Sequence, residues 1–339
     1  MNTEDFNYDL PLSYIAQKPI EPRDNSKLLV FDRSLNYICH RTFKQLGEFL
    51  QKGDLLVINQ TRVIPARIFA RKMPGGGRVE ILLLRKIDDL KWLCLVGGSG
   101  LVPGRQLVIE NGPGAHVTAV LDGAQRVICF ENPIETFFDR VGHVPLPPYI
   151  HEKLQDPARY QTVYAAAPGS AAAPTAGLHF TPQLIQDLEA HGISFAEVTL
   201  HVGLDTFAPV TETDPEEHVI HKEWCELTCE VAERINLTRE QGGRVVAVGT
   251  TTVRTLESSA DPSRKGYVLP WSGDTGLYIL PGYQFKVVDA MTTNFHLPKS
   301  TLLMLVSAFT GRERILELYE LAKQENYRFF SFGDAMLIL

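Results

Sequence analysis

The chain has 339 residues, of which 44% are apolar and 22% charged, and its formal net charge is −7. This composition excludes a collagen-like, coiled-coil or wholly disordered protein, and the length predicts two domains. The longest apolar stretch, residues 302–309, is too short to cross a bilayer, and the acidic N-terminus lacks a signal-peptide pattern. We therefore expect a soluble, cytoplasmic protein.

Five scattered cysteines argue against a disulfide framework and fit a reducing compartment. Cys225 and Cys229, with His218 and His221 nearby, raise the alternative of a zinc site. Their CxxxC spacing is not that of a usual zinc knuckle, and no second pair follows. Structural thiols are the preferred interpretation, and no metal is expected.

The first sixty residues predict an α/β arrangement. Short apolar segments indicate strands at 27–31, 37–40 and 54–59, and Thr42 is expected to cap a helix that runs to about Gln51. The segment DLLVIN at 54–59 is continuously apolar, which is typical of a strand buried on both faces.

The pattern changes between residues 67 and 131, where short strands follow one another without a convincing helix. Six are predicted, at 67–72, 78–86, 91–96, 106–110, 116–121 and 126–131. Turns rich in Gly and Pro separate them, as in a small barrel or sandwich. Because α/β sequence lies on both sides, we expect an inserted all-β, barrel-like domain at 63–145 in a discontinuous α/β domain formed by 1–62 and 146–339.

Helices and strands alternate again after residue 146. Thr181, followed by Pro182, predicts the start of a helix that ends at Gly192. Further segments predict strands at 194–202 and 244–248 and helices at 230–241, from about 252, at 298–310 and at 312–326, before an apolar end at 335–339. The Ala-rich segment 165–173, with its Pro and Gly, predicts a mobile loop.

Basic residues gather in one part of this acidic chain. Residues 61–150 hold eleven Lys and Arg against eight Asp and Glu, and eight of those eleven fall within 62–91. Such a patch can contact phosphates without making the whole chain a non-specific nucleic-acid binder. The alternative is a solvated, charged face of a sheet.

Polar residues follow the predicted strand that ends at Gly249. The next residues are Thr250, Thr251 and Thr252, with Arg254 close behind. A strand, a glycine turn and a helix start together offer a site for a carboxylate or a ribose. The alternative is that Thr252 only caps the helix.

Three histidines, His179, His201 and His296, lie beside apolar residues near Gly or Pro. Each alone is more simply a core residue, but three together favour a polar pocket. Their spacing is not that of metal ligands, and the motifs HExxH, GxSxG and GxGxxG and the P-loop do not occur. Acid–base or binding roles are therefore preferred to metal or covalent chemistry.

Several ordered stretches resemble the S-adenosylmethionine:tRNA ribosyltransferase-isomerase family of queuosine biosynthesis. They include FNYDLP (6–11), DLLVINQTRV (54–63), APTAGLHFT (173–181), VGTTTVRTLE (248–257) and TNFHLP (293–298). One position departs from the family pattern HVGxGTF, because Asp205 stands where Gly is expected.

The resemblance implies an α/β domain with an inserted β-barrel. It also implies that S-adenosylmethionine is a co-substrate that donates its ribosyl group, with neither a metal nor a permanently bound cofactor. The acceptor would be 7-aminomethyl-7-deazaguanine at the tRNA wobble position, and the products epoxyqueuosine, adenine and methionine. A base of the anticodon loop can be splayed out and recognised at its edges. We expect a monomer that acts on tRNA and has no membrane partner.

The implied chemistry assigns candidate roles. A sulfonium acidifies the neighbouring C5′ proton, so the site needs a proton acceptor, a proton donor for adenine and a partner for the methionine carboxylate. His179 and His201 are the candidate catalytic residues. The candidate residues for binding S-adenosylmethionine are Thr250, Thr251, Thr252, Arg254 and His296, and those for tRNA are Arg62, Arg67 and Lys299.

Two other function classes stay open. An S-adenosylmethionine-dependent RNA methyltransferase should show a Gly-rich strand–turn–helix near its N-terminus, which this sequence lacks. A non-catalytic RNA-binding module would need neither the three histidines nor the GTTT turn. Release of free adenine separates both from the ribosyltransferase.

Overall fold

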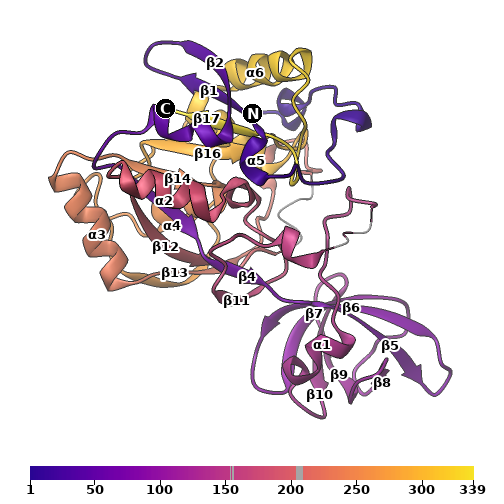
Figure 1. Cartoon of the computed structure of the whole chain (residues 1–339). Coiled ribbons are helices and arrows are strands. Elements are labelled where there is room, and N and C mark those ends of the chain that lie inside the picture. The colour runs from indigo at the N-terminus through magenta and orange to yellow at the C-terminus, as the bar shows by residue number, and fades with distance from the viewer. Residues whose placement is uncertain (153, 155, 204–208) are drawn as a thin grey trace. The chain divides into compact units, whose positions relative to one another are not determined.

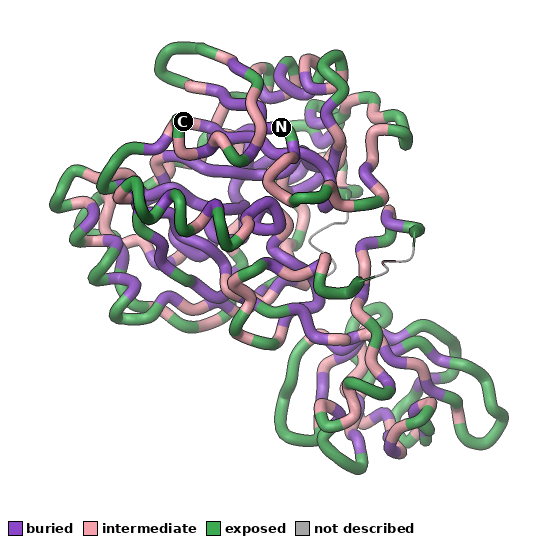
Figure 2. The backbone as a smooth tube through the Cα atoms, viewed as in Figure 1, coloured by how far each residue is buried: buried purple, intermediate pink, exposed green. Residues whose placement is uncertain are grey.

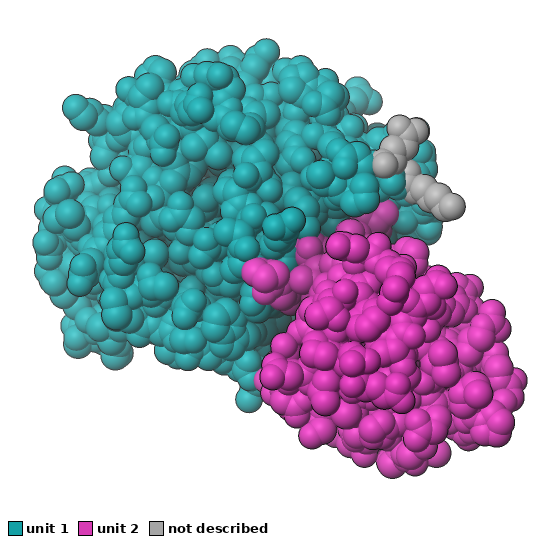
Figure 3. Space-filling view, turned by 60° about the horizontal axis from the view of Figure 1, so that its bottom comes forward, with its two compact units in different colours: residues 1–62, 147–167, 173–339 teal, residues 63–146, 168–172 magenta. Residues whose placement is uncertain are grey.

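The computed structural model describes residues 1–152, 154, 156–203 and 209–339. The chain divides into two compact units (Figure 3). Unit 1 comprises residues 1–62, 147–167 and 173–339, and unit 2 comprises residues 63–146 and 168–172. Unit 1 is built on a mixed sheet with helices and unit 2 on a closed barrel, so the predicted fold class is confirmed.

The sheet of unit 1 has nine strands (Figure 1). They are β1 (Lys27–Asp32), β2 (Tyr37–Thr42), β3 (Leu55–Asn59), β12 (Ser194–Leu200), β13 (Glu223–Leu227), β14 (Val245–Val248), β15 (Trp271–Thr275), β16 (Ala290–Asn294) and β17 (Ala335–Ile338). Their order is β15-β13-β12-β3-β14-β16-β17-β1-β2. The four central strands β12, β3, β14 and β16 are parallel, so their carboxyl ends share one edge.

Helices cover both faces of this sheet. The α-helices of unit 1 are α2 (Pro182–Ala190), α3 (Cys229–Glu240), α4 (Thr250–Ser258), α5 (Thr301–Thr310) and α6 (Arg312–Gln324). Its short 3-10 helices are η1 (Thr3–Phe6), η2 (Leu12–Tyr14), η3 (Arg23–Asn25), η4 (Phe43–Phe49), η6 (Pro157–Tyr160), η7 (Thr175–His179) and η9 (Pro215–Glu217). No helix in the described part of the chain is long and apolar enough to span a bilayer.

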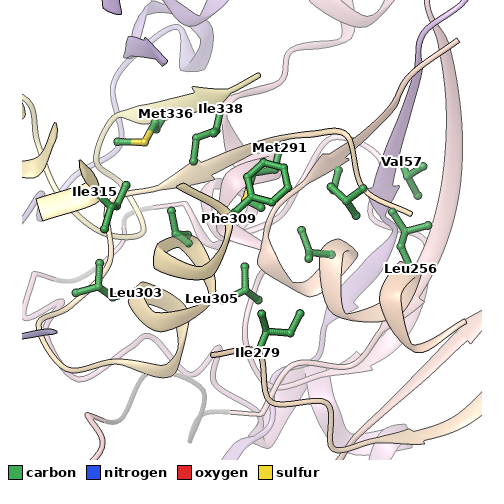
Figure 4. Close-up of a cluster of buried hydrophobic side chains, with 14 of the residues drawn as sticks. Val57, Leu256, Ile279, Met291, Leu303, Leu305, Phe309, Ile315, Met336 and Ile338 are labelled. Atoms are coloured by element: carbon green, nitrogen blue, oxygen red, sulfur yellow. The ribbon is translucent and has the colours of Figure 1, made fainter. Parts of the chain in front are cut away.

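Strand β3 shows why its sequence is continuously apolar. Leu55 and Val57 pack with α3 to α6 in one cluster, whereas Leu56 and Ile58 pack with α2 and η4 in another. Alternate side chains point to opposite faces, so a strand covered on both sides needs apolar residues throughout. Figure 4 shows part of the first cluster, with Val57 at one edge and Met291 and Phe309 near its middle, and Figure 2 shows the buried centre of the sheet.

Unit 2 contains the predicted six strands. They are β5 (Arg67–Met73), β6 (Arg78–Lys86), β7 (Lys91–Gly97), β8 (Gln106–Ile109), β9 (Gly114–Val120) and β10 (Gln125–Phe130), closed in the order β10-β7-β6-β5-β8-β9. Short helices η5 (Ile134–Phe137) and α1 (Phe138–Val141) follow. Along β5, buried Ile68 and Ala70 alternate with more exposed neighbours, as the period of two predicted.

Several boundaries differ from the sequence predictions. The segment expected as a mobile loop contains β11 (Ala167–Ser170), which pairs with β4 (Thr61–Val63), so that prediction was wrong. The helix expected after Thr42 is the 3-10 helix η4, held at its start by a capping box with Gln45. Helix α5 begins at Thr301 because the Ser300 hydroxyl accepts from the Leu303 N–H at its first turn.

Candidate active site

A pocket opens in unit 1 among the loops that follow the parallel strands. It measures about 610 Å³ including its mouth, a size that suits a small ligand. Its polar lining residues are Tyr149, Thr175, Thr250, Thr251, Thr293, Asn294, His296, Ser300 and Ser331. Aromatic and aliphatic side chains complete it, among them Phe295, Leu297, Leu302 and Phe330. Among the described lining residues none is Asp, Glu, Lys or Arg, so the ligand meets dipoles rather than formal charges.

The first turn of α4 forms one wall of the pocket. Gly249 precedes it with φ of +89°, a left-handed conformation that favours glycine, and turns the chain directly from β14 into the helix. Gly249, Thr250 and Thr251 all line the pocket, and the Thr251 hydroxyl accepts from the Asn59 amide at 3.3 Å. First-turn N–H groups have no partner within their helix, so this wall can bind an anion.

Thr252 and Arg254 lie elsewhere, although the sequence grouped them with this turn. The fully buried Thr252 hydroxyl donates to the Val248 carbonyl at 2.8 Å, so this residue neither caps α4 nor lines the pocket. Arg254 forms a buried ion pair with Glu223 and donates from Nε to the Leu277 carbonyl at 3.1 Å. It borders a second pocket of about 440 Å³ instead.

His296 lines the main pocket. Its Nε2 lies 2.7 Å from the Thr293 hydroxyl, and its backbone N–H donates to the Tyr319 hydroxyl at 2.9 Å. The Tyr8 hydroxyl donates to its carbonyl at 2.5 Å. Burial lowers the pKa of His296 to about 3, so the ring is neutral at physiological pH.

His179 is a buried residue of η7 that does not line the main pocket. Its Nδ1 lies 2.7 Å from the Ser26 hydroxyl and its Nε2 lies 3.1 Å from the Asn294 amide nitrogen. The ring stacks on Phe43 with centroids 5.0 Å apart. Burial, with Arg328 nearby, lowers the pKa of His179 to about 3. Both nitrogens are therefore occupied inside the protein.

His201 follows β12 and is only partly buried. Its Nδ1 lies 2.8 Å from the Thr61 hydroxyl, and its ring stacks on Trp224 with centroids 5.2 Å apart. Burial lowers its pKa. The next residue, Val202, lines the pocket, whereas His201 is outside the lining.

The three candidate tRNA contacts differ in how far they are already engaged. Arg62 is exposed on β4. The Arg67 Nε lies 3.0 Å from a carboxylate oxygen of Glu80. Lys299 forms an ion pair with Glu4 and has a left-handed φ of +58°. Arg62 is thus the most available of the three for a phosphate.

Sequence reasoning missed Asn294, Tyr149 and Ser331 as lining residues. The signal for Asn294 was present, because a polar residue ends the buried strand β16 beside the end of β14. Tyr149 and Ser331 are far apart in the sequence, yet their hydroxyls lie 2.7 Å apart. Only the fold brings that pair together.

The two cysteines considered as zinc ligands lie in different surroundings. Burial raises the pKa of Cys225 to about 12, and Cys229 is exposed at the start of α3. Within the described ranges, no group of three or more His, Cys, Asp or Glu side chains is arranged to hold a metal. Asp205 lies outside the described residues.

The chain is similar to known proteins over its whole length. A family model described as queuosine biosynthesis protein matches residues 3–338. The chain is 53% identical to the S-adenosylmethionine:tRNA ribosyltransferase-isomerase of Symbiobacterium thermophilum and 51% identical to that of Acetivibrio thermocellus, with 100% of both proteins covered each time. A crystal structure of S-adenosylmethionine tRNA ribosyltransferase from Thermotoga maritima is 40% identical, with a TM-score of 0.58 over 99% of this chain and 100% of that one.

Proposed function

The chain belongs to the queuosine biosynthesis protein family, and we infer that it catalyses the reaction for which its relatives are named. It transfers the ribosyl group of S-adenosylmethionine to tRNA and isomerises it. The observation that carries this conclusion is the full-length match at about half identity to two enzymes of that name. An RNA methyltransferase or a non-catalytic RNA-binding module is not favoured by this match.

We propose that the acceptor is 7-aminomethyl-7-deazaguanine at the wobble position of tRNA. Its exocyclic amine is a nucleophile that can attack the ribosyl fragment, and closure to the epoxide then expels methionine. The products would be epoxyqueuosine, adenine and methionine. A tRNA-modifying enzyme works where tRNA is found, so we propose that the protein is located in the cytoplasm. We also propose that it acts as a monomer.

S-adenosylmethionine is the co-substrate, and we propose that its carboxylate binds at the first turn of α4. The amides of Thr250 and Thr251 lie in the pocket wall, and the helix dipole favours an anion there. Arg254 was the other candidate partner, but its guanidinium is engaged by Glu223 and borders another pocket. We therefore assign the carboxylate to the backbone amides rather than to that side chain.

Proton transfer requires a group that can change its charge near neutral pH. The geometry favours His201 over His179, because no described residue occupies its Nε2, whereas both ring nitrogens of His179 are bonded. His296 reaches the pocket, but with a pKa of about 3 it is a weak base. We propose His201, which stands outside the lining but next to the lining residue Val202, as the acid–base residue and His296 as a neutral hydrogen-bonding partner of the ligand.

Product analysis tests the proposed function. Purified protein is incubated with S-adenosylmethionine and tRNA that carries the aminomethyl precursor, and small molecules are quantified by mass spectrometry. We expect adenine and methionine in equal amounts and no adenine with tRNA that carries guanine at the wobble position. Production of S-adenosylhomocysteine instead would identify a methyltransferase and contradict the proposal.

A further inference from the structure

A buried chain of hydrogen bonds runs from Ser26 through His179 to Asn294 and ends at the pocket. The Ser26 hydroxyl lies 2.7 Å from Nδ1 of His179, and Nε2 of that ring lies 3.1 Å from Nδ2 of Asn294. The Asn294 amide also contacts the Phe330 carbonyl at 3.2 Å and the Thr175 hydroxyl at 3.1 Å. Asn294 and Thr175 line the pocket, whereas His179 does not.

The Phe330 carbonyl fixes the direction of every bond in this chain. A carbonyl oxygen only accepts, so the Asn294 atom facing it must be the NH₂ group. The same NH₂ then donates to Nε2 of His179, which must be the unprotonated nitrogen of a neutral ring. Nδ1–H therefore donates to Ser26. The low pKa of His179 agrees with this neutral tautomer.

The opposite side of the Asn294 amide consequently presents its oxygen. Oδ1 accepts from the Thr175 hydroxyl, and an amide oxygen has two lone pairs. The described residues fill one of them. Because the Thr175 hydroxyl donates its hydrogen to Asn294, its oxygen can also accept a hydrogen bond from the ligand. This part of the pocket is thus an uncharged cluster of acceptors that can bind a hydrogen-bond donor of the ligand.

Aromatic residues line the same pocket as these acceptors. Phe330 and Tyr149 lie with ring centroids 4.9 Å apart, and both line the pocket with Phe295. A flat ring can pack against aromatic side chains while an amino group on its edge donates to Asn294. The combination suits an amino-bearing heterocycle better than a free sugar hydroxyl, which gains nothing from the rings.

We propose that Asn294 binds the amino group of a heterocyclic base and that His179 is a positioning residue that, together with the Phe330 carbonyl, holds the Asn294 amide in this orientation. This deepens the proposed function and rests on it, because two such bases take part in that reaction. One is the adenine of S-adenosylmethionine, and the other is the deazaguanine of tRNA. Loss of His179 removes one of the two acceptors that hold the NH₂ group, so the amide is less firmly oriented and its oxygen binds the donor less well.

Asn294→Ala tests which base is bound. We measure the Kd of S-adenosylmethionine by calorimetry and the KM of tRNA from adenine release. One lost hydrogen bond should weaken one of the two substrates by about 3- to 15-fold and leave the other unchanged. If adenine is the base, the wild type should also discriminate against the analogue with an oxo group in place of the purine amine, and Asn294→Ala should not. Unchanged values for both substrates in a folded variant would overturn the proposal.

A double-mutant comparison tests the positioning role. If His179 acts through Asn294, His179→Leu should weaken binding of the same substrate, by no more than Asn294→Ala does, and the double variant should be no weaker than Asn294→Ala. A merely structural His179 would lower the melting temperature without selecting one substrate, and that result would overturn the role. Ser307→Ala is the matched control, since it removes a buried hydroxyl that donates to the Leu303 carbonyl in α5. Adenine release by the wild type tests the proposed reaction itself. A failure of that reaction can therefore be told apart from a failure of the roles proposed for Asn294 and His179.

Discussion

Replacement of Arg254 distinguishes a structural ion pair from a ligand contact. The side chains of Arg254 and Glu223 are 4% and 5% exposed, and the guanidinium also donates to the Leu277 carbonyl. Arg254→Ala leaves the Glu223 carboxylate buried without its cation, which typically costs about 3–5 kcal/mol. Since a domain is stable by only about 5–15 kcal/mol, the variant should lose a large part of its free energy of unfolding.

The double variant Arg254→Met with Glu223→Gln is the matched control. It removes both charges, and a neutral amide can still accept from the Gly203 N–H that Glu223 holds at 2.8 Å. We expect urea denaturation to show that most of the lost free energy returns, and calorimetry to show binding of S-adenosylmethionine within about threefold of the wild type. A single variant as stable as the wild type would refute the argument from burial. A stable double variant that no longer binds S-adenosylmethionine would show that Arg254 contacts it.

Three further predictions follow from individual contacts. Gly177→Ala places a Cβ 2.0 Å from the Tyr164 hydroxyl, so thermal melts should show destabilisation that Tyr164→Phe partly reverses. Arg62→Ala should reduce the slope of log affinity for tRNA against log salt by about one, and Arg67→Ala should reduce it less because its guanidinium is already paired; equal slopes would contradict this. The pKa of His179 is about 3 in the folded protein and about 6.5 in the unfolded chain. Below pH 6.5 only the unfolded chain takes up the proton, so the free energy of unfolding falls by about 1.4 kcal/mol per pH unit as the pH drops toward 3, whereas above pH 6.5 this loss is absent. Urea denaturation of His179→Gln should show a flatter pH dependence, and an unchanged one would contradict the assignment.

The architecture was predictable where one physical pattern dominates. A strand with two covered faces requires continuous apolar residues, which made β3 recognisable, and half-buried barrel strands such as β5 alternate. The start of α4 was harder, because the sequence does not show that Gly249 takes a left-handed conformation and begins the helix at Thr250. The two-residue difference moved Thr252 from the expected cap to the fully buried side of the helix.

The candidate site was predictable in place but not in detail. The end of β14 was identified because a buried strand, a glycine and hydroxyl residues follow one another locally. The environment of His179 was not, since its partners Ser26 and Asn294 are 153 and 115 residues away in the sequence. Tertiary contacts determine whether a histidine is bonded on both sides or available, and a single sequence does not encode that locally.

The position of β17 has a consequence for how the protein is made. This strand lies between β16 and β1, and it joins the β1–β2 hairpin to the rest of the sheet through the pairing of Leu28 with Ala335. The hairpin is synthesised long before its partner strand, because β1 and β2 come early in the order of elements and β17 follows all the others that the structure describes. Long-range pairing of this kind slows folding. The edge of β1 that pairs with β17 therefore stays unpaired until the last part of this chain has been synthesised.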